Sequence, residues 1–387
     1  MNNTIKLAVA SALLAAASSA NAGIMIPAGD WTLDIGGVVN AYYTSTRASG
    51  TATGLAGAND TGTKTASNIT TGLLPNYLSV SGKTRQNDLD VGFTISINPG
   101  ASTTQSGIQT AQQENRQAFL TFGDASWGSI KLGKDLGIYA SDAILNDMTL
   151  LGVGSAAGML AGNTTTLGRI GTGFMYADWK SQIAYSSPNW NGFSFTAGVT
   201  QAWNGTGNTQ RGGSEPAYEG KASYAWAGDF AGKVWASGLT QNVEGADDRA
   251  NAWDLGATVN VAGFGLTGYY GQGEGTGTTV LFNQGYDLAG QARDSDDWYV
   301  QGTYTLPGVG TKLGVSYGES TLDGNAIDAF NETQNRMWTV GAYHPLTKHL
   351  NLVAEYSDVK GEFDGKVAGT STEGKTKTIA LGAILFF

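Results

Sequence analysis

The chain has 387 residues, 57 glycines, no cysteine and a formal net charge of −10 at pH 7. Without cysteine, the fold has neither a disulfide framework nor a thiolate metal site. The excess of acidic residues argues against nucleic acid as a partner. A mean hydropathy of −0.16 looks water-soluble, but strands that alternate lipid-facing and water-facing residues give a similar average.

The first 22 residues have the pattern of a secretory signal peptide. Lys6 precedes an apolar run that begins at Leu7, and the segment closes with the small-x-small sequence Ala20-Asn21-Ala22. We therefore expect residues 1–22 to be removed on export and residues 23–387 to form the mature domain. No later stretch reaches the roughly 18 to 20 apolar residues that a membrane-spanning helix needs. An exported chain of this kind is either free of the membrane or crosses it with strands.

Segments of about ten residues that alternate apolar with polar or small residues recur along the mature sequence, as tilted strands crossing a bilayer would. Between Phe193 and Thr200, for example, Phe, Phe, Ala and Val alternate with Ser, Thr, Gly and Thr. Similar rows begin at Trp253, Trp298, Leu313 and Leu350. Aromatic residues recur at the ends of these rows, where the interface girdles of a transmembrane barrel lie. The pattern predicts an all-β chain.

The connections between these segments alternate in length. Short turns are expected at 87–88, 123–127, 188–192, 228–232, 262–263, 307–310 and 345–349. Long polar connections are expected at 45–76, 99–112, 135–178, 203–217, 243–249, 274–293, 321–334 and 360–374. Seven short and eight long connections predict sixteen strands. A closed antiparallel barrel with short periplasmic turns and long extracellular loops segregates its loops in this way.

The last strand carries the clearest row. Ile379, Leu381, Ala383, Leu385 and Phe387 form an unbroken apolar series at period two. Such a row predicts one face against lipid, with the terminal Phe near an interface. The alternative is the edge strand of a soluble β-sandwich.

Two central stretches and both chain ends resemble the general diffusion porins of Gram-negative outer membranes. The stretches are Glu114–Gly123 with Trp127–Lys134, and Ser181–Pro188 with Gly192–Phe195. The resemblance implies a sixteen-stranded barrel in the lipid of the outer membrane, assembled as a homotrimer. It also implies that the third long loop folds inward, and that ions and small hydrophilic solutes diffuse passively through a water-filled channel.

In this family, acidic residues on the inward loop face basic residues on the wall. The resemblance therefore places the pore constriction at 135–178, with candidate residues Asp142, Asp147, Arg116, Arg169, Lys131 and Arg85. The family often has a second acid four residues after the position of Asp147, where this chain has Leu151. The arginine that the family has on the second strand is replaced here by Tyr77-Leu78. The arginine position assigned to Arg169 could instead fall at Asp178.

The sequence predicts neither an enzyme nor a cofactor or metal. Its two histidines, His344 and His349, flank one short turn, a poor place for a catalytic base. An outer-membrane barrel enzyme, such as a lipase-like hydrolase, and an exported β-rich surface adhesin are the alternatives. The acid excess favours cations moderately as the preferred ions.

Overall fold

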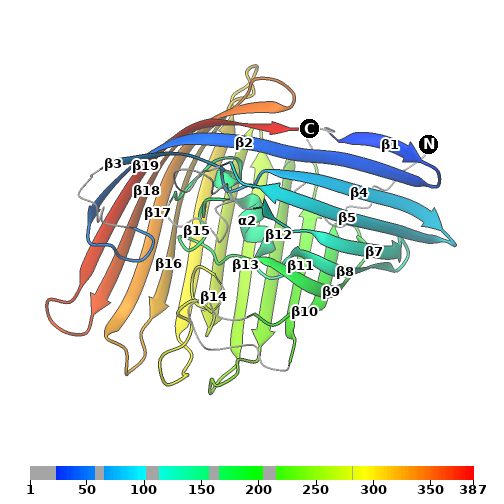
Figure 1. Cartoon of the computed structure of the whole chain (residues 1–387). Helices are drawn as coiled ribbons and strands as arrows, with labels where there is room; N and C mark the ends of the chain where they lie inside the picture. Colours follow the sequence, from blue (N-terminus) through cyan, green and yellow to red (C-terminus); the bar gives the residue numbers. More distant parts are fainter. Residues whose placement is uncertain (1–22, 57–64, 102–112, 157–164, 204–214, 281) are drawn as a thin grey trace.

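The computed structural model describes residues 23–56, 65–101, 113–156, 165–203, 215–280 and 282–387. The predicted signal peptide, residues 1–22, lies outside them. Sixteen antiparallel strands close into a barrel (Figure 1), which confirms the predicted fold. In order round the wall they are β2 (Trp31–Gly50), β4 (Tyr77–Gln86), β5 (Leu89–Pro99), β7 (Ala118–Asp124), β8 (Gly128–Leu136), β9 (Trp179–Ser186), β10 (Phe193–Thr200), β11 (Ala217–Trp226), β12 (Phe230–Gln241), β13 (Ala250–Val261), β14 (Phe264–Glu274), β15 (Asp294–Thr305), β16 (Lys312–Asp323), β17 (Phe330–Pro345), β18 (Leu350–Gly365) and β19 (Thr372–Phe386).

Five further elements accompany the wall. They are the short strands β1 (Ile24–Ala28), β3 (Thr65–Thr70) and β6 (Gln113–Glu114), the helix α2 (Ser141–Asn146) and the 3₁₀ turn η1 (Met148–Leu151). β1 and β3 pair with β2, and β6 pairs with the end of β5. Among the described residues, no helix is long and apolar enough to cross a membrane.

The first and last barrel strands pair with each other and close the barrel. β19 pairs with β2 from Gly374 to Phe386, and backbone bonds of 2.8 and 3.0 Å between Phe387 and Gly37 complete the ladder. Beyond this point β1 continues along the same edge of β2, beginning with Ile24 opposite Ile35. Figure 1 shows red β19 beside blue β2, and β1 next to the C-terminus. Closure leaves no strand edge of this pair open to another chain.

The predicted apolar row of β19 faces outward. Ile379, Leu381 and Leu385 are 49%, 52% and 39% exposed, whereas Ile384 and Phe386 on the other face are almost completely buried. Because successive side chains of a strand point to opposite faces, one strand can meet both lipid and the barrel interior. The outward row is the face expected against lipid.

Several strands are longer than the sequence indicated. The connections expected at 321–334 and 360–374 shorten to 324–329 and 366–371, since β16, β17, β18 and β19 continue into them. On these extensions charged residues lie on the outward face, as at Lys360 and Glu362. The alternation of apolar with polar residues therefore ends before the strands do.

The interior of the barrel contains an apolar core that the sequence did not reveal. Leu73 and Leu74, from the connection after β3, pack with Ile144 and Leu150 of the inward loop. The wall contributes Tyr299 and other aromatic side chains to the same cluster. Part of the lumen at this level is thus filled by protein instead of water.

Candidate pore constriction

The chain between β8 and β9 folds into the lumen and carries α2, which Figure 1 shows among the wall strands. Ala140 adopts a left-handed backbone conformation (φ 60°) immediately before the helix. After it, the Asp147 carboxylate accepts a bond from the backbone N–H of Thr149 (3.0 Å) and caps η1. A side-chain cap of this kind satisfies an amide that the turn itself leaves unpaired.

Two glutamates on distant strands hold the ends of this segment. Glu219 of β11 accepts the backbone N–H groups of Ile138 and Tyr139 at 2.8 and 2.9 Å. Glu355 of β18 lies seven strand pairings further round the wall and accepts from Val153 (2.7 Å) and Gly154 (2.9 Å). Residues 138–154 are therefore fixed at both ends by charge-assisted hydrogen bonds, which are stronger than neutral ones.

Wall residues between the two glutamates hold the middle of the segment. Gln301 accepts from the N–H of Met148 (2.6 Å) and donates to the carbonyl of Asn146 (3.0 Å). Tyr299 donates its hydroxyl to the carbonyl of Ala143 (2.9 Å), and Ser237 accepts from Ala140 (3.1 Å). These contacts attach the inward loop to β12 and β15 as well as to the strands that carry the glutamates.

Arg169 continues the attachment on the later part of the loop. Its side chain is completely buried and donates to the carbonyl of Met337 (3.0 Å) and to the hydroxyl of Ser316. Burial lowers the pKa of Arg169, while nearby Asp147 opposes that effect. Burial likewise raises the pKa of Asp147, with Arg169 opposing it. The two residues predicted on opposite sides of the constriction thus lie close together inside the loop.

Asp142 contacts two lysines of the wall instead of the predicted basic residues. Lys221 of β11 lies 3.3 Å from its carboxylate, and Lys233 of β12 forms a second ion pair with it. Asp142 is 4% exposed at its side chain, whereas the lysine side chains are 27% and 29% exposed. Burial alone would raise the pKa of Asp142, but the lysines outweigh burial and lower it below its ordinary value.

The other three predicted residues lie elsewhere, each paired with one or two nearby acids. Arg116 pairs with Glu114 at 2.8 Å and lies over the Trp179 ring. Lys131 pairs with Asp135. Arg85 bonds Asp90 and Asp124 (2.9 and 2.8 Å), next to the short turns, and its side chain is 49% exposed. The structure therefore does not gather the six predicted residues into one cluster.

Two more segments reach the inward loop. Asn40 of β2 bonds the chain after β3, through Gly72 (2.9 Å) and Leu74 (2.8 Å), and Leu73 in turn donates to Gly152 of the inward loop. In the connection after β14, Thr279 accepts the N–H of Tyr176 at 2.9 Å. The inward loop is thus supported from two other long connections.

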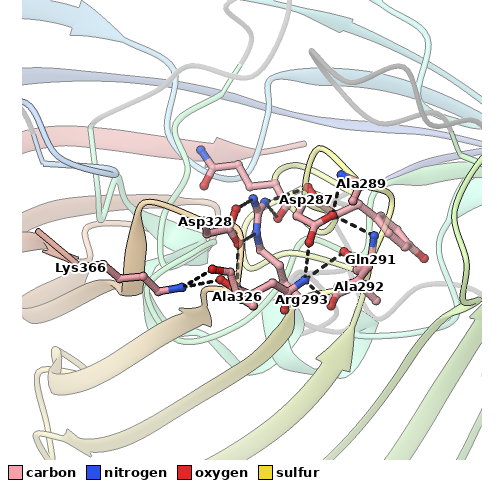
Figure 2. A network of polar contacts seen from close by, with 11 residues as sticks. Asp287, Ala289, Gln291, Ala292, Arg293, Ala326, Asp328 and Lys366 are labelled. Carbon is pink, nitrogen blue, oxygen red and sulfur yellow. Dashed lines mark hydrogen bonds and ion pairs between the residues drawn. The ribbon is translucent and has the colours of Figure 1, made fainter.

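Figure 2 shows how the connection after β14 is held on its other side. Arg293 forms a two-point ion pair with Asp328 (2.8 and 2.6 Å), which lies between β16 and β17. Lys366, after β18, donates to the carbonyls of Asn325 and Ala326. The Arg293 contact holds the pKa of Asp328 below its ordinary value. Polar contacts therefore connect three consecutive long loops.

A closed barrel with an apolar outer face and an inward loop held across its lumen defines a β-barrel membrane channel. The chain belongs to the Gram-negative porin family, whose family model matches residues 8–364. It is an outer-membrane channel for passive diffusion.

Solved structures share this fold at low identity. The outer membrane channel DcaP of Acinetobacter baumannii superposes with a TM-score of 0.67 at 18% identity, covering 95% of this chain and 100% of that chain. The anion-selective porin from Comamonas acidovorans gives 0.59 at 17%, covering 92% and 100%. The trimer form of in-vitro folded OmpT from Vibrio cholerae gives 0.55 at 14%, covering 92% and 99%. A search of curated protein sequences finds no significant match.

Sequence reasoning missed Glu219, Lys221, Lys233 and Glu355. Each lies on a barrel strand, on the face that points into the lumen. The available signal was a charged residue on the polar face of an alternating segment, but every lumen-facing charge gives that signal. Only the path of the inward loop distinguishes these four.

Proposed function

We propose that the charged group formed by Asp142, Lys221 and Lys233 sets the ion selectivity of the channel, and that it favours anions moderately. The observation that supports this proposal is the unequal exposure of the three side chains. Asp142 is almost buried, whereas both lysines keep more than a quarter of their side chains exposed. Two cations with one buried carboxylate leave a positive excess beside the lumen.

This proposal reverses the cation preference expected from composition. The net charge of −10 is spread over the whole chain, and salt screens distant charges, with a Debye length of about 10 Å at 0.1 M. Charges at a narrow point act on a solute at close range, and low-dielectric walls focus their field. Local charge therefore outweighs the overall charge.

The test is the reversal potential in planar bilayers under a salt gradient. We expect wild type to favour anions and the double variant Lys221→Gln/Lys233→Gln to shift toward cations. The control Arg249→Gln/Lys348→Gln removes the same two charges from a long loop and a short turn, and should change the potential little. An equal shift in both double variants would assign selectivity to overall charge.

We also propose three features of assembly from the family resemblance: removal of residues 1–22 on export, a homotrimer, and outer-membrane lipid around the apolar face. The fold shared with a trimer form of OmpT supports the second. Mass measurement of the purified protein in detergent tests the first two together. A chain that retains residues 1–22, or a monomer, would count against them.

We further propose that the channel performs no chemistry on the solutes that pass. His344 bonds the Thr311 hydroxyl through its Nδ1 at 2.8 Å, at the short-turn end of the wall. Within the described ranges, no three His, Asp or Glu side chains are grouped to hold a metal ion. Hydrolysis of ester or peptide substrates by the purified protein, abolished by His344→Gln, would contradict this proposal.

A further inference from the structure

A second connection packs against the inward loop, on the side of the long loops. It follows β14 and is described at residues 275–280 and 282–293, here called the outer loop. Its Phe282 and Tyr286 are 0% and 3% exposed. They share one apolar cluster with residues from the beginning and the end of the inward loop: Tyr139, Ala140, Met175 and Ala177. Because burial of this apolar surface is favourable, the outer loop is stabilised in a position that covers the inward loop.

A third loop meets the outer loop above the later part of the inward loop. Gly171, in that part, has a φ of +72° and no side chain. A Cβ atom there would lie 2.5 Å from the hydroxyl oxygen of Thr279, in the outer loop, and 2.9 Å from Cδ1 of Leu55, in the loop after β2. β14 and β2 are six strand pairings apart round the wall. Two loops from distant strands therefore meet across this side of the entrance.

Arg293 fixes the outer loop to the turn between β16 and β17 (Figure 2). Its guanidinium binds both carboxylate oxygens of Asp328, in that turn. It also donates to two carbonyls of the outer loop itself, those of Gln284 (2.7 Å) and Tyr286 (2.8 Å). The Arg293 and Asp328 side chains are only 10% and 8% exposed, so salt screens this ion pair little. A two-point arginine pair of this kind fixes orientation as well as distance.

Asn325 of the same turn supplies a second attachment. Its side-chain amide donates to the Asp287 carboxylate (3.0 Å) and to the carbonyls of Ala292 (3.0 Å) and Gln291 (3.2 Å). Both attachments join the outer loop to the turn, and neither uses a residue of the inward loop. The outer loop is thus held over the entrance by contacts separate from those that fix the inward loop to the wall.

We propose that the outer loop forms a second narrowing of the channel, at the entrance on the side of the long loops, and that Arg293 is the residue that positions it. Passage through a pore depends on its diameter as well as on the charges that line it. The outer loop limits the size of the solutes that reach the inward loop, whereas Asp142, Lys221 and Lys233 act on their charge. Size and charge are therefore selected at different heights of one channel.

Single-channel recordings in planar bilayers test this proposal with polyethylene glycols of increasing size, added to one side at a time. The largest polymer that still lowers the current measures the entrance on that side. The variant Arg293→Gln/Asp328→Asn removes the ion pair without changing the net charge. We expect it to conduct more current and to admit larger polymers from one side only, with an unchanged reversal potential. The control Arg336→Gln/Glu362→Gln removes an ion pair of 2.6 Å from the outer face of the wall and should behave like wild type.

A second arm leaves the ion pair in place. In Leu55→Cys/Thr279→Cys, a short bis-methanethiosulfonate reagent should join the two loops without changing conductance or polymer exclusion, because the loops already meet there. The same crosslink, added to Arg293→Gln/Asp328→Asn, should restore the wild-type polymer limit, and a reductant should reverse the effect. Failure of the two cysteines to crosslink would overturn the proposal. So would a polymer limit that stays at the wild-type value when the ion pair is removed.

Discussion

Glu219 and Glu355 perform the same task on distant parts of the wall but in different surroundings. Each accepts two neighbouring backbone N–H groups of the inward loop. Glu219 also accepts from Thr200 and forms an ion pair with Lys180, whose side chain is 1% exposed. Glu355 instead accepts the hydroxyl of Tyr343 at 2.6 Å, and none of the ion pairs within the described ranges includes it.

Both glutamates attach the inward loop, but Glu219 also neutralises the charge of a buried lysine. The groups that donate directly to Glu355, two backbone N–H groups and the Tyr343 hydroxyl, are neutral. Around Glu219, removing the charge leaves a buried ammonium without its partner, and an uncompensated buried charge is far more costly than a weakened hydrogen bond. The two attachments should therefore respond unequally to the same substitution.

The largest effect is expected for Glu219→Gln, with a loss of about 3–5 kcal/mol of stability because Lys180 stays buried and unpaired. Asp135, opposite Lys180 on β8, is already paired with Lys131. Urea unfolding in lipid vesicles measures the change. Adding Lys180→Met should restore most of the loss, since no buried charge then remains. Additive losses in the double variant would contradict the account.

Glu355→Gln should cost about 1 kcal/mol in the same assay. The amide oxygen can still accept from Val153 and Gly154, and no cation is left unpaired. Glu355→Ala, which removes the acceptor as well, should be clearly worse than Gln. The comparison fails if Glu355→Gln is as damaging as Glu219→Gln.

The smallest effect is expected from pH, through Asp142. Its folded-state pKa lies below the ordinary value, so the ion pair contributes stability above about pH 4. That contribution is lost as the pH falls through the lowered pKa, when the carboxyl becomes protonated. We therefore expect a constant reversal potential from neutral pH down to about pH 5. A change above pH 5 would mean that another group titrates.

The sequence predicted the wall much better than the interior. The row from Ile379 to Phe387 identified an outward face because lipid demands apolar side chains at every second position. Leu73 and Leu74 showed no such period, since they lie in a connection whose partners are distant in sequence. The extensions beyond the apolar band, at Lys360 and Glu362, looked like loops because charged outward residues conceal the strand period.

The residues of the candidate constriction were also harder to predict than the wall. Family resemblance located the inward loop and its Asp142, but the resemblance did not identify Lys221 and Lys233, which depend on where α2 meets the wall. Arg85 was the nearest arginine in sequence to an expected position, yet it lies beside the short turns with Asp90 and Asp124. Placing the constriction at the six candidate residues, Arg116, Asp147, Asp142, Arg169, Lys131 and Arg85, stays a prediction.

Because the chain has no cysteine, Lys233→Cys allows the most direct test of the central claim that Lys233 faces the ion path. Its reversal potential is recorded before and after positively and negatively charged methanethiosulfonate reagents, with Lys377→Cys on the outer wall as control. We predict that the positive reagent restores anion preference in Lys233→Cys and the negative reagent shifts it further toward cations, while Lys377→Cys is unaffected. If neither reagent changes Lys233→Cys, or both variants respond alike, selectivity is not set at this site.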